Sequence, residues 1–345
     1  MISNNAQTFQ PLNSLILGIE SSCDDTSVAV LKNGNQLLSN ITYSQIELHQ
    51  PFGGVVPELA ARDHLRQIVP VIEKSLQSAQ VNFSDLTAIA ATRGPGLIGS
   101  LLCGLQAGKA LAYVFQLPFV GIHHHFAHIS AAFYCNPPPT FPFLCLVVSG
   151  GHTSLSIVSN FDSIQIIGNT RDDAVGEAFD KIAKVLGFPY PGGKYIEQNA
   201  KDGNIHAYKF PKSMPQKNTL DFSYSGLKTA AINLLKNSTI TFNKTDFCAG
   251  IQHTLVEQLL RKTLLALEKY HLSRLVIVGG VACNQYLRDT ITSGVKKLSS
   301  RNEVFIPEKK LCTDNGAMVA MAGFIQLSRG IQHDFSLDAK AYLPL

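Results

Sequence analysis

The chain has 345 residues, of which 45% are hydrophobic and 16% charged, and its formal net charge is +4 at pH 7. This composition excludes a disordered chain, and no apolar run reaches the ~18 residues that a membrane-spanning helix needs. The seven cysteines form no C-x-x-C pair, and the first cationic residues are Lys32 and Arg62. We therefore expect reduced thiols, no export signal, no membrane partner and a cytoplasmic location.

A pattern near the start of the chain returns in its middle. Residues 17–30 (LGIESSCDDTSVAV) and 147–158 (VVSGGHTSLSIV) each predict a β-hairpin, with Thr-Ser after the polar turn in both copies. Short hydroxyls and backbone amides at such turns suit a phosphate. The repeat predicts two related lobes that face a shared cleft, with a nucleotide's phosphates held between the turns.

Helix and strand signals alternate along the rest of the chain, which favours an α/β fold. We predict a helix beginning at Pro57, a buried strand at 86–92, an apolar helix at 97–115, a helix at 172–186 and a strand at 275–278. The segment NPPP at 136–139 marks the main boundary. The expected organisation is a loose extension at 1–14, an N-terminal lobe at 15–135, a C-terminal lobe at 136–325 and a segment at 326–345 that packs back on the N-terminal lobe.

Histidines cluster at 123–125 and 128. His124 and His128 lie four residues apart, so both imidazoles project from one helix face and can share a metal. Residues 86–161 contain no Asp or Glu, so a carboxylate must come from elsewhere, and Asp314 in the polar segment LCTDNGA is the best-placed candidate. Two His and one carboxylate suit Fe(II) as well as Zn(II), although spacing alone also fits histidines that bind no metal.

Other catalytic patterns are incomplete. The zinc-protease motif H-E-x-x-H needs a Glu where His125 stands, so proteolysis is disfavoured. The segment 93–99 (RGPGLIG) matches the G-x-G-x-x-G pattern of a dinucleotide-binding site. The acidic residue expected ~20 positions later, which would bind the ribose, is missing. The segment therefore predicts either a helix N-terminus that binds an anion or a glycine loop that packs closely against its neighbours. There is no G-x-x-x-x-G-K-[ST] phosphate loop and no G-x-S-x-G nucleophile elbow.

Two segments allow both a ligand-binding and a structural interpretation. The helix around Asp180 suits a solvated face with i,i+4 ion pairs, but the Gly-Gly turn at 192–193 could bring a ribose beside Asp180. Asn284 follows a buried strand and Gly279-Gly280. Its amide suits a ribose or a base, or it caps the next helix.

These segments together resemble the tRNA adenosine threonylcarbamoyltransferase family, from about Leu15 to Met321. The motifs that carry the resemblance are GIESSCDDTSVAV, GGVVPELAARDH, RGPGLIGSL, GIHHHFAH, LVVSGGHTSL, DDAVGEAFDKIAKVLG, PYPGG, SYSGLKTA, GGVACNQYLR and CTDNGAMVA. The resemblance implies the two-lobed actin-like fold of the actin, sugar-kinase and heat-shock-ATPase (ASKHA) superfamily, with duplicated βββαβα-type lobes and a nucleotide cleft between them.

The activity that the resemblance implies is transfer of a threonylcarbamoyl group from threonylcarbamoyl-AMP to the exocyclic amine of the adenosine at position 37, beside the anticodon, in tRNAs that read codons beginning with A. One divalent metal is implied at His124, His128 and Asp314, with Fe(II) favoured and Zn(II) possible. Threonylcarbamoyl-AMP, or ATP or AMP, is implied in the cleft. The implied substrate-binding residues are Val147, Val148, Ser149, Gly150, Gly151, Asp180, Gly193, Glu197 and Asn284.

The implied partners are tRNA and the other subunits of a threonylcarbamoyl-transfer complex, which in the bacterial type are a paralogous actin-like protein and a small ATPase. The apolar helices of the first lobe are the expected docking surface. This chain departs from the usual family residues at Lys194, Glu197, Tyr224 and Cys283. These departures bear on individual contacts with the substrate and not on the reaction. The alternatives are a small-molecule kinase of the same superfamily, a metalloprotease, and an actin-like scaffold.

Overall fold

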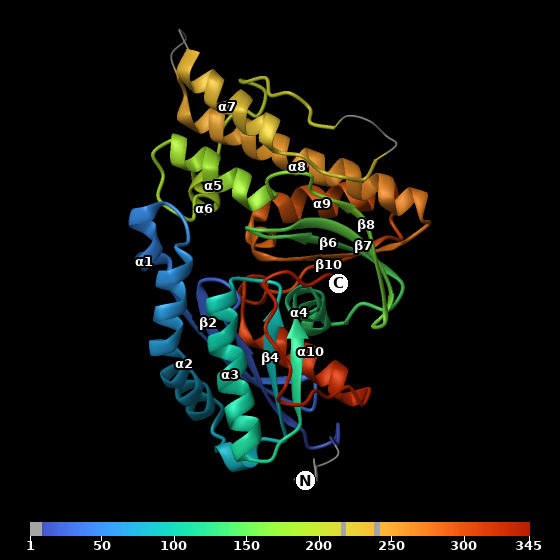
Figure 1. Cartoon of the computed structure of the whole chain (residues 1–345). Coiled ribbons are helices and arrows are strands. Elements are labelled where there is room, and N and C mark those ends of the chain that lie inside the picture. Colours follow the sequence, from blue (N-terminus) through green and yellow to red (C-terminus); the bar gives the residue numbers. More distant parts are fainter. Residues whose placement is uncertain (1–8, 215–218, 238–241) are drawn as a thin grey trace. The chain divides into compact units, whose positions relative to one another are not determined.

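The computed structural model describes residues 9–214, 219–237 and 242–345 (Figure 1). The chain divides into unit 1, residues 1–134 and 314–345, and unit 2, residues 135–313. The first division lies one residue from the predicted boundary, whereas the second lies at 313/314 instead of 325/326. Residues 1–8 of the predicted loose extension lie outside the described residues. Phe9 is buried and packs edge-to-face on Phe324, with ring centroids 6.3 Å apart.

Unit 1 is built on a five-stranded sheet with the order β3-β2-β1-β4-β5. The predicted first hairpin is confirmed as β1 and β2, which pair antiparallel with Leu17 opposite Val30. β3 pairs antiparallel with β2, while β4 and β5 continue the sheet parallel to β1. The bounds are β1 Leu15–Glu20, β2 Asp25–Lys32, β3 Gln36–Ser44, β4 Ala88–Gly94 and β5 Phe119–His123.

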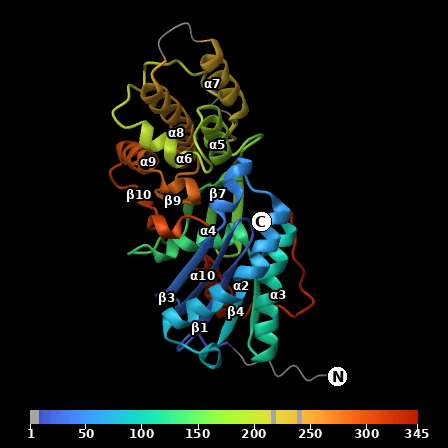
Figure 2. The same cartoon turned by 90° about the vertical axis from the view of Figure 1, so that its left-hand side faces the viewer.

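Helices cover both faces of this sheet (Figure 2). One face packs on α2 and α3 through alternate strand residues such as Leu17, Val28 and Ile89. Pro57 begins α2 as predicted, since its missing N–H would be unpaired in a first turn anyway. The helices of unit 1 are α1 Ile46–His49, α2 Pro57–Ala79, α3 Ile98–Val114, α4 His124–Ala131 and α10 Gly316–Ser328.

α10 packs against the opposite face at a very short distance. A Cβ on Gly18 of β1 would overlap the backbone of Ala320, and a Cβ on Gly316 would overlap the backbone of Val28 in β2. Only glycine at these positions allows the helix and the strands to approach so closely. This packing explains why residues 314–325 belong with unit 1, although they follow the second lobe in chain order.

Unit 2 repeats the strand arrangement of unit 1. Its sheet has the order β10-β9-β6-β7-β8, with β6-β7-β8 antiparallel and β9 and β10 parallel to β6. The second predicted hairpin is confirmed as β6 and β7. The bounds are β6 Phe143–Val148, β7 Thr153–Asn160, β8 Ser163–Asn169, β9 Arg274–Val278 and β10 Glu303–Phe305.

The helices of unit 2 share one apolar core with this sheet. Leu144, Leu146 and Val148 alternate along β6 and pack with α5, α8 and α9. α5 begins at Val175 rather than at the predicted Asp172, because Asp172 is used to accept hydrogen bonds from the Tyr224 and Ser225 N–H groups. The bounds are α5 Val175–Val185, α6 Gly193–Asn199, α7 Ser225–Asn237, α8 Lys244–Lys269 and α9 Gln285–Leu298.

Two further findings concern membrane-spanning helices and cysteine pairing. Among the described residues, no helix combines the length and apolar character needed to cross a membrane. All seven cysteines lie in described segments and are free thiols, as the sequence predicts.

Candidate metal centre

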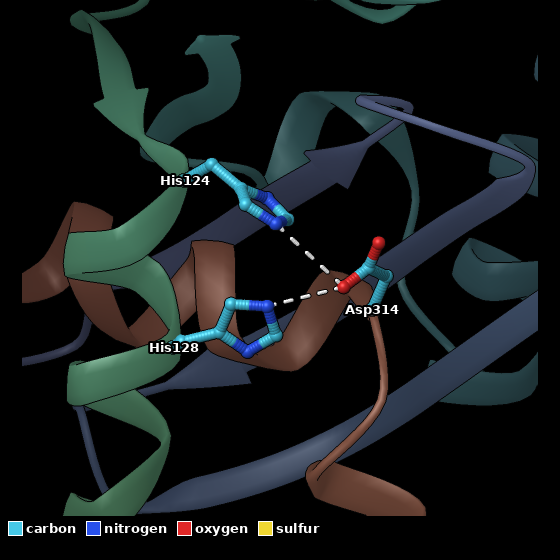
Figure 3. A group of neighbouring side chains, drawn as sticks. All are labelled: His124, His128 and Asp314. Atoms are coloured by element: carbon cyan, nitrogen blue, oxygen red, sulfur yellow. Dashed lines mark ion pairs between the residues drawn. The ribbon is translucent and has the colours of Figure 1, made fainter. Parts of the chain in front are cut away.

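The step from β5 into α4 places two histidines on one face of a helix. α4 begins at His124, and the Nδ1 of His123 caps it by accepting a hydrogen bond from the His125 N–H at 3.1 Å. Because residues four apart share a helix face, His124 and His128 project in the same direction. Figure 3 shows both imidazoles beside the carboxylate of Asp314.

Asp314 reaches these histidines from the loop that precedes α10. The Oδ1 of Asn315 caps α10 by accepting from the Met318 N–H at 2.9 Å. The Gly316 N–H donates to the Oγ of Ser27 in β2 at 2.8 Å. The cap and the bond to the sheet fix the backbone directly after Asp314, and therefore the position of its carboxylate.

The three predicted ligands are close together within unit 1. The Oδ1 of Asp314 lies 3.1 Å from the Nε2 of His128 and 3.7 Å from the Nε2 of His124. One ligand atom from each residue lies within 4.8 Å of the other two. The side chains of His124 and His128 are 8% and 1% exposed, whereas that of Asp314 is 24% exposed. Solvent and substrates therefore reach the group mainly on the side of the carboxylate.

The ring of His128 provides a test of whether a metal fits these residues. Within the described part of the chain, neither of its buried ring nitrogens makes a hydrogen bond, although Nε2 faces the Asp314 carboxylate. A buried polar atom without a hydrogen bond costs about 1–3 kcal/mol. Coordination of a cation by Nε2 removes that cost for this atom, and two imidazoles with one carboxylate suit Zn(II) or Fe(II). The residues present thus fit a divalent metal.

Glu20, at the end of β1, supports the centre and was not identified from the sequence. Its carboxylate is fully buried, accepts a hydrogen bond from the Thr92 Oγ1 at 2.6 Å and lies 3.4 Å from the Nδ1 of His124. A carboxylate on Nδ1 orients the ring and leaves Nε2 for a metal. The available signal was an acidic residue at the end of an apolar strand, LILGIE, since a buried charge needs a partner.

The electrostatics of the centre favour a cation. Burial alone would lower the pKa of His124, but the carboxylates of Asp314 and Glu20 outweigh burial and raise it to about 9. Burial raises the pKa of Asp25 to about 7, with a further contribution from the carboxylates of Asp24, Asp314 and Glu20. An imidazolium at His124 therefore balances an excess of buried negative charge in the metal-free chain. A divalent cation would supply that balance instead.

The predicted phosphate-binding residues form the turn between β6 and β7 in unit 2. Val147 and Val148 end β6 with buried side chains, and the Ser149 N–H donates to the carbonyl of His152 at 2.8 Å to close the turn. A Cβ on Gly150 or Gly151 would meet no atom within 4 Å, so the backbone of the turn is open to an incoming group. The four residues of the turn are Ser149, Gly150, Gly151 and His152.

The start of α5 lies against this turn. The Gly176 N–H donates to the carbonyl of Ser149 at 3.3 Å, and a Cβ on Gly176 would clash with the backbone of Ser149 and Gly150. The N-terminus of a helix carries a partial positive charge and attracts anions. An open glycine turn beside a helix N-terminus is an arrangement that can hold a phosphate.

The remaining predicted residues of unit 2 are linked through backbone hydrogen bonds. The Oδ1 of Asp180 in α5 accepts from the Gly192 N–H at 2.7 Å, which places the turn before Gly193 beside α5. The Oε1 of Glu197 in α6 accepts from the Gln285 N–H at 2.6 Å. These bonds connect α5, the glycine turn, α6 and the start of α9, so residues from distant parts of the sequence become neighbours.

Asn284 caps α9, which was one of the two interpretations that the sequence allows. Its Oδ1 accepts from the Leu287 N–H at 2.9 Å, and its Nδ2 donates to the Oε1 of Gln252 at 2.9 Å. Both ends of the amide therefore bind protein atoms, and the side chain is buried. A contact from Asn284 to an adenosine would have to share these atoms or use the backbone.

Comparisons with known proteins point to one family. Residues 36–321 match the family model TsaD, described as tRNA N6-adenosine threonylcarbamoyltransferase. A curated relative from Desulfitobacterium hafniense is 50% identical over 313 residues, which are 90% of this chain and 91% of that protein. Relatives from Listeria monocytogenes and Moorella thermoacetica are 47% and 45% identical, each over 96% of this chain and 97% of its own length. All three carry the name tRNA N6-adenosine threonylcarbamoyltransferase.

Solved structures of low sequence identity share the fold. Component A of the Acidaminococcus fermentans (R)-2-hydroxyglutaryl-CoA dehydratase aligns with a TM-score of 0.55 at 15% identity, over 91% of this chain and 99% of its own. Full-length HypF in its phosphate- and nucleotide-bound form aligns with a TM-score of 0.59 at 14% identity, over 92% of this chain and 56% of its own. The two five-stranded sheets form the actin-like ASKHA fold predicted from the sequence.

The first prediction concerns metal binding by the histidines of α4. Replacing His124 or His128 with Ala removes one of three ligands. We therefore expect these variants, once loaded with Zn(II) or Fe(II), to lose the metal during dialysis against metal-free buffer. His125→Ala, a change in the same helix outside the triad, is the matched control and should retain one equivalent. Metal content is measured by inductively coupled plasma mass spectrometry. Equal metal content in all variants would show that the triad is not the site.

The second prediction concerns Glu20. Glu20→Gln removes the negative charge beside the Nδ1 of His124 and should weaken metal affinity by about 10–100-fold, the usual effect of losing such a partner. Competition with a chelating dye measures the affinity, and thermal unfolding checks the fold. Glu73→Gln on the exposed face of α2 is the control. Wild-type affinity in Glu20→Gln would contradict a supporting role for Glu20.

Proposed function

Because the chain belongs to the tRNA N6-adenosine threonylcarbamoyltransferase family, we propose that it transfers the threonylcarbamoyl group of threonylcarbamoyl-AMP to the exocyclic amine of the adenosine at position 37 in tRNAs that read codons beginning with A. The observation that carries this proposal is identity of 45–50% to curated relatives of that name over nearly the whole chain. The product is threonylcarbamoyladenosine, and AMP leaves. The shared name favours this reaction over a small-molecule kinase, a scaffold or a protease.

Unit 1 contributes the residues that would hold the metal, which are His124, His128 and Asp314. The chemistry that a bound divalent cation supplies is Lewis-acid polarisation of the threonylcarbamoyl carbonyl. The carboxylate of Glu20 contacts the Nδ1 of His124 and so helps to fix the orientation of that ring. Three protein ligands leave further positions for a substrate, and the donor set accommodates Fe(II), which we favour, or Zn(II).

Unit 2 contributes the residues that would hold the adenylate. In this proposal the amides of Gly150 and Gly151 and the N-terminus of α5 bind the phosphate, which gains negative charge as AMP becomes the leaving group. Asp180 positions the glycine turn through the Gly192 N–H, and Glu197 positions the start of α9 through the Gln285 N–H. The nucleotide part of the site thus consists of backbone groups held in place by carboxylates.

The tRNA substrate agrees with the distribution of charge along the chain. Most of the Lys and Arg residues lie in unit 2, whereas unit 1 has more acidic than basic residues. Basic side chains neutralise backbone phosphates and release counterions, which favours binding. The small net charge of +4 indicates weak tRNA binding by this subunit alone, so that partner subunits would add affinity.

We place the docking surface for a paralogous actin-like partner on α2 and α3. Leu65 and Val69 of α2 are 67% and 56% exposed, and Ile98 and Leu102 of α3 are 48% and 40% exposed. The two helices touch at Ala61 and Gly99, where a Cβ on the glycine would lie 2.9 Å from that of Ala61. Exposed aliphatic side chains on packed helices suit a protein partner. A small ATPase completes the proposed complex.

The third prediction tests the reaction. Unmodified tRNA incubated with threonylcarbamoyl-AMP, the partner subunits and wild-type protein should yield threonylcarbamoyladenosine, detected by mass spectrometry of digested nucleosides. His124→Ala should lose at least about 100-fold in rate, since one ligand of the metal is missing. His125→Ala should remain within about threefold of wild type. Product formation by His124→Ala at the wild-type rate would reject the role of the metal, and no product with wild-type protein would reject the reaction.

The fourth prediction tests the docking surface. The double variant Leu65→Glu/Val69→Glu places two charges on the apolar face and should weaken binding of the paralogous partner by more than about tenfold. Isothermal titration calorimetry measures the affinity. Leu298→Glu, at an exposed leucine of α9 in unit 2, is the matched control and should bind normally. Unchanged affinity of the double variant would place the partner elsewhere.

A further inference from the structure

Two consecutive residues of α8 contact the start of α9, the helix beside it in unit 2 (Figure 1). Gln252 and His253 lie in the first half of α8, and Asn284 and Tyr286 lie at the N-terminus of α9. The Oε1 of Gln252 accepts from the Nδ2 of Asn284 at 2.9 Å, and the Nδ1 of His253 lies 2.7 Å from the hydroxyl oxygen of Tyr286. Two side-chain contacts therefore hold this end of α9 to α8.

Gln252 is a polar residue in an apolar part of α8. It is 4% exposed, and its neighbours Ile251, Leu255 and Val256 belong to the apolar core of unit 2. An amide that is buried without hydrogen bonds destabilises the fold, whereas leucine or methionine fills such a position without that penalty. The hydrogen bond to Asn284 gives a reason for a glutamine here that packing alone does not give.

The cap of α9 determines which way the amide of Asn284 faces. The Leu287 N–H is a donor, so the atom that it meets at 2.9 Å is the oxygen Oδ1 of Asn284. The nitrogen Nδ2 then lies on the other side of the amide and needs an acceptor, which the Oε1 of Gln252 provides. The two contacts together fix the rotation of the amide about its last side-chain bond.

The fixed amide retains half of its hydrogen-bonding capacity. A side-chain amide has two N–H donors and two oxygen lone pairs, and the protein uses one of each at Asn284. The residue is 7% exposed, so it is not completely closed off from solvent. One donor and one lone pair remain, and a nucleoside offers complementary groups on both its base and its ribose.

We propose that Gln252 is a positioning residue of the adenylate site, which orients the amide of Asn284 so that its second N–H and second lone pair bind the adenosine part of the nucleotide. The inference rests on the proposed function, because that function places an adenylate at Asn284. Gln252 acts through Asn284 and makes no contact of its own with the nucleotide. The contact between His253 and Tyr286 holds the same end of α9 without touching the amide.

The experiment measures the affinity of the full chain for AMP by isothermal titration calorimetry. Gln252→Met nearly keeps the side-chain volume and removes the acceptor, so AMP should bind about 3–10-fold more weakly, the range expected for one hydrogen bond. Gln252→Leu, a second apolar replacement, should give the same result. Tyr286→Phe removes the other contact between α8 and α9 and leaves the amide in place, so it is the matched control and should bind AMP as the wild type does. Thermal unfolding checks that the variants fold.

A double-mutant cycle tests whether Gln252 acts through Asn284. Asn284→Ser keeps an oxygen that can cap α9 and removes the amide nitrogen. Gln252 then has no amide to orient, so adding Gln252→Met should cause no further loss of AMP affinity. In the transfer assay with tRNA and the partner subunits, Gln252→Met alone should raise the KM for threonylcarbamoyl-AMP and leave kcat unchanged, because the lost interaction contributes to binding.

Three results would overturn the proposal. The first is unchanged AMP affinity in the variants of Gln252. The second is an equal loss of affinity in Gln252→Met and Tyr286→Phe, which would reflect the stability of this end of α9 and not the orientation of the amide. The third is additive losses in the double-mutant cycle. Failure of the proposed function gives a different result, because the wild-type protein would then bind no AMP at all.

Discussion

The buried carboxylate of Glu20 is the constraint on which the centre in unit 1 depends. A charge inside the core is stable only with partners. The carboxylate accepts hydrogen bonds from the Thr92 Oγ1 and the Ser22 N–H, and its ionisable partner is the Nδ1 of His124 at 3.4 Å. Glu20 and the Oγ of Ser22, 3.1 Å from the same Nδ1, hold the ring with its Nε2 toward Asp314. The packing of α10 on β1 and β2, through Gly18 and Gly316, brings Asp314 to the same place. Core packing and buried charge thus fix the positions of the ligands before any metal binds.

The duplicated fold explains how one chain can divide the chemistry between its units. Each sheet has the same strand order, and each first hairpin has a turn of four residues, 21–24 in unit 1 and 149–152 in unit 2. The first turn carries acidic Asp24 and follows Glu20, which favours a cation nearby. The second turn carries Gly150 and Gly151 beside the start of α5, which favours an anion. In our proposal the two turns therefore serve the metal and the adenylate phosphate.

Local periodicity accounts for what the sequence could predict. The spacing of His124 and His128 specifies a shared helix face, and both hairpins follow from apolar alternation around polar turns. Glu20 was missed because its partner His124 lies 104 residues away, which no local pattern reports. The place of residues 314–325 in unit 1 depends on close packing at glycines. The cap at Asn284 is local and was one of two sequence interpretations, but the bond from its Nδ2 to Gln252, 32 residues away, is visible only in the fold.

The central claim is that His124, His128 and Asp314 hold a divalent metal. The most direct measurement is anomalous diffraction, at the absorption edges of iron and zinc, from crystals of the protein purified without chelators. The account predicts one anomalous peak about 2.0–2.2 Å from the Nε2 atoms of both histidines and from a carboxylate oxygen of Asp314. A metal-replete crystal with no peak between these three residues, or with its peak elsewhere, would contradict it.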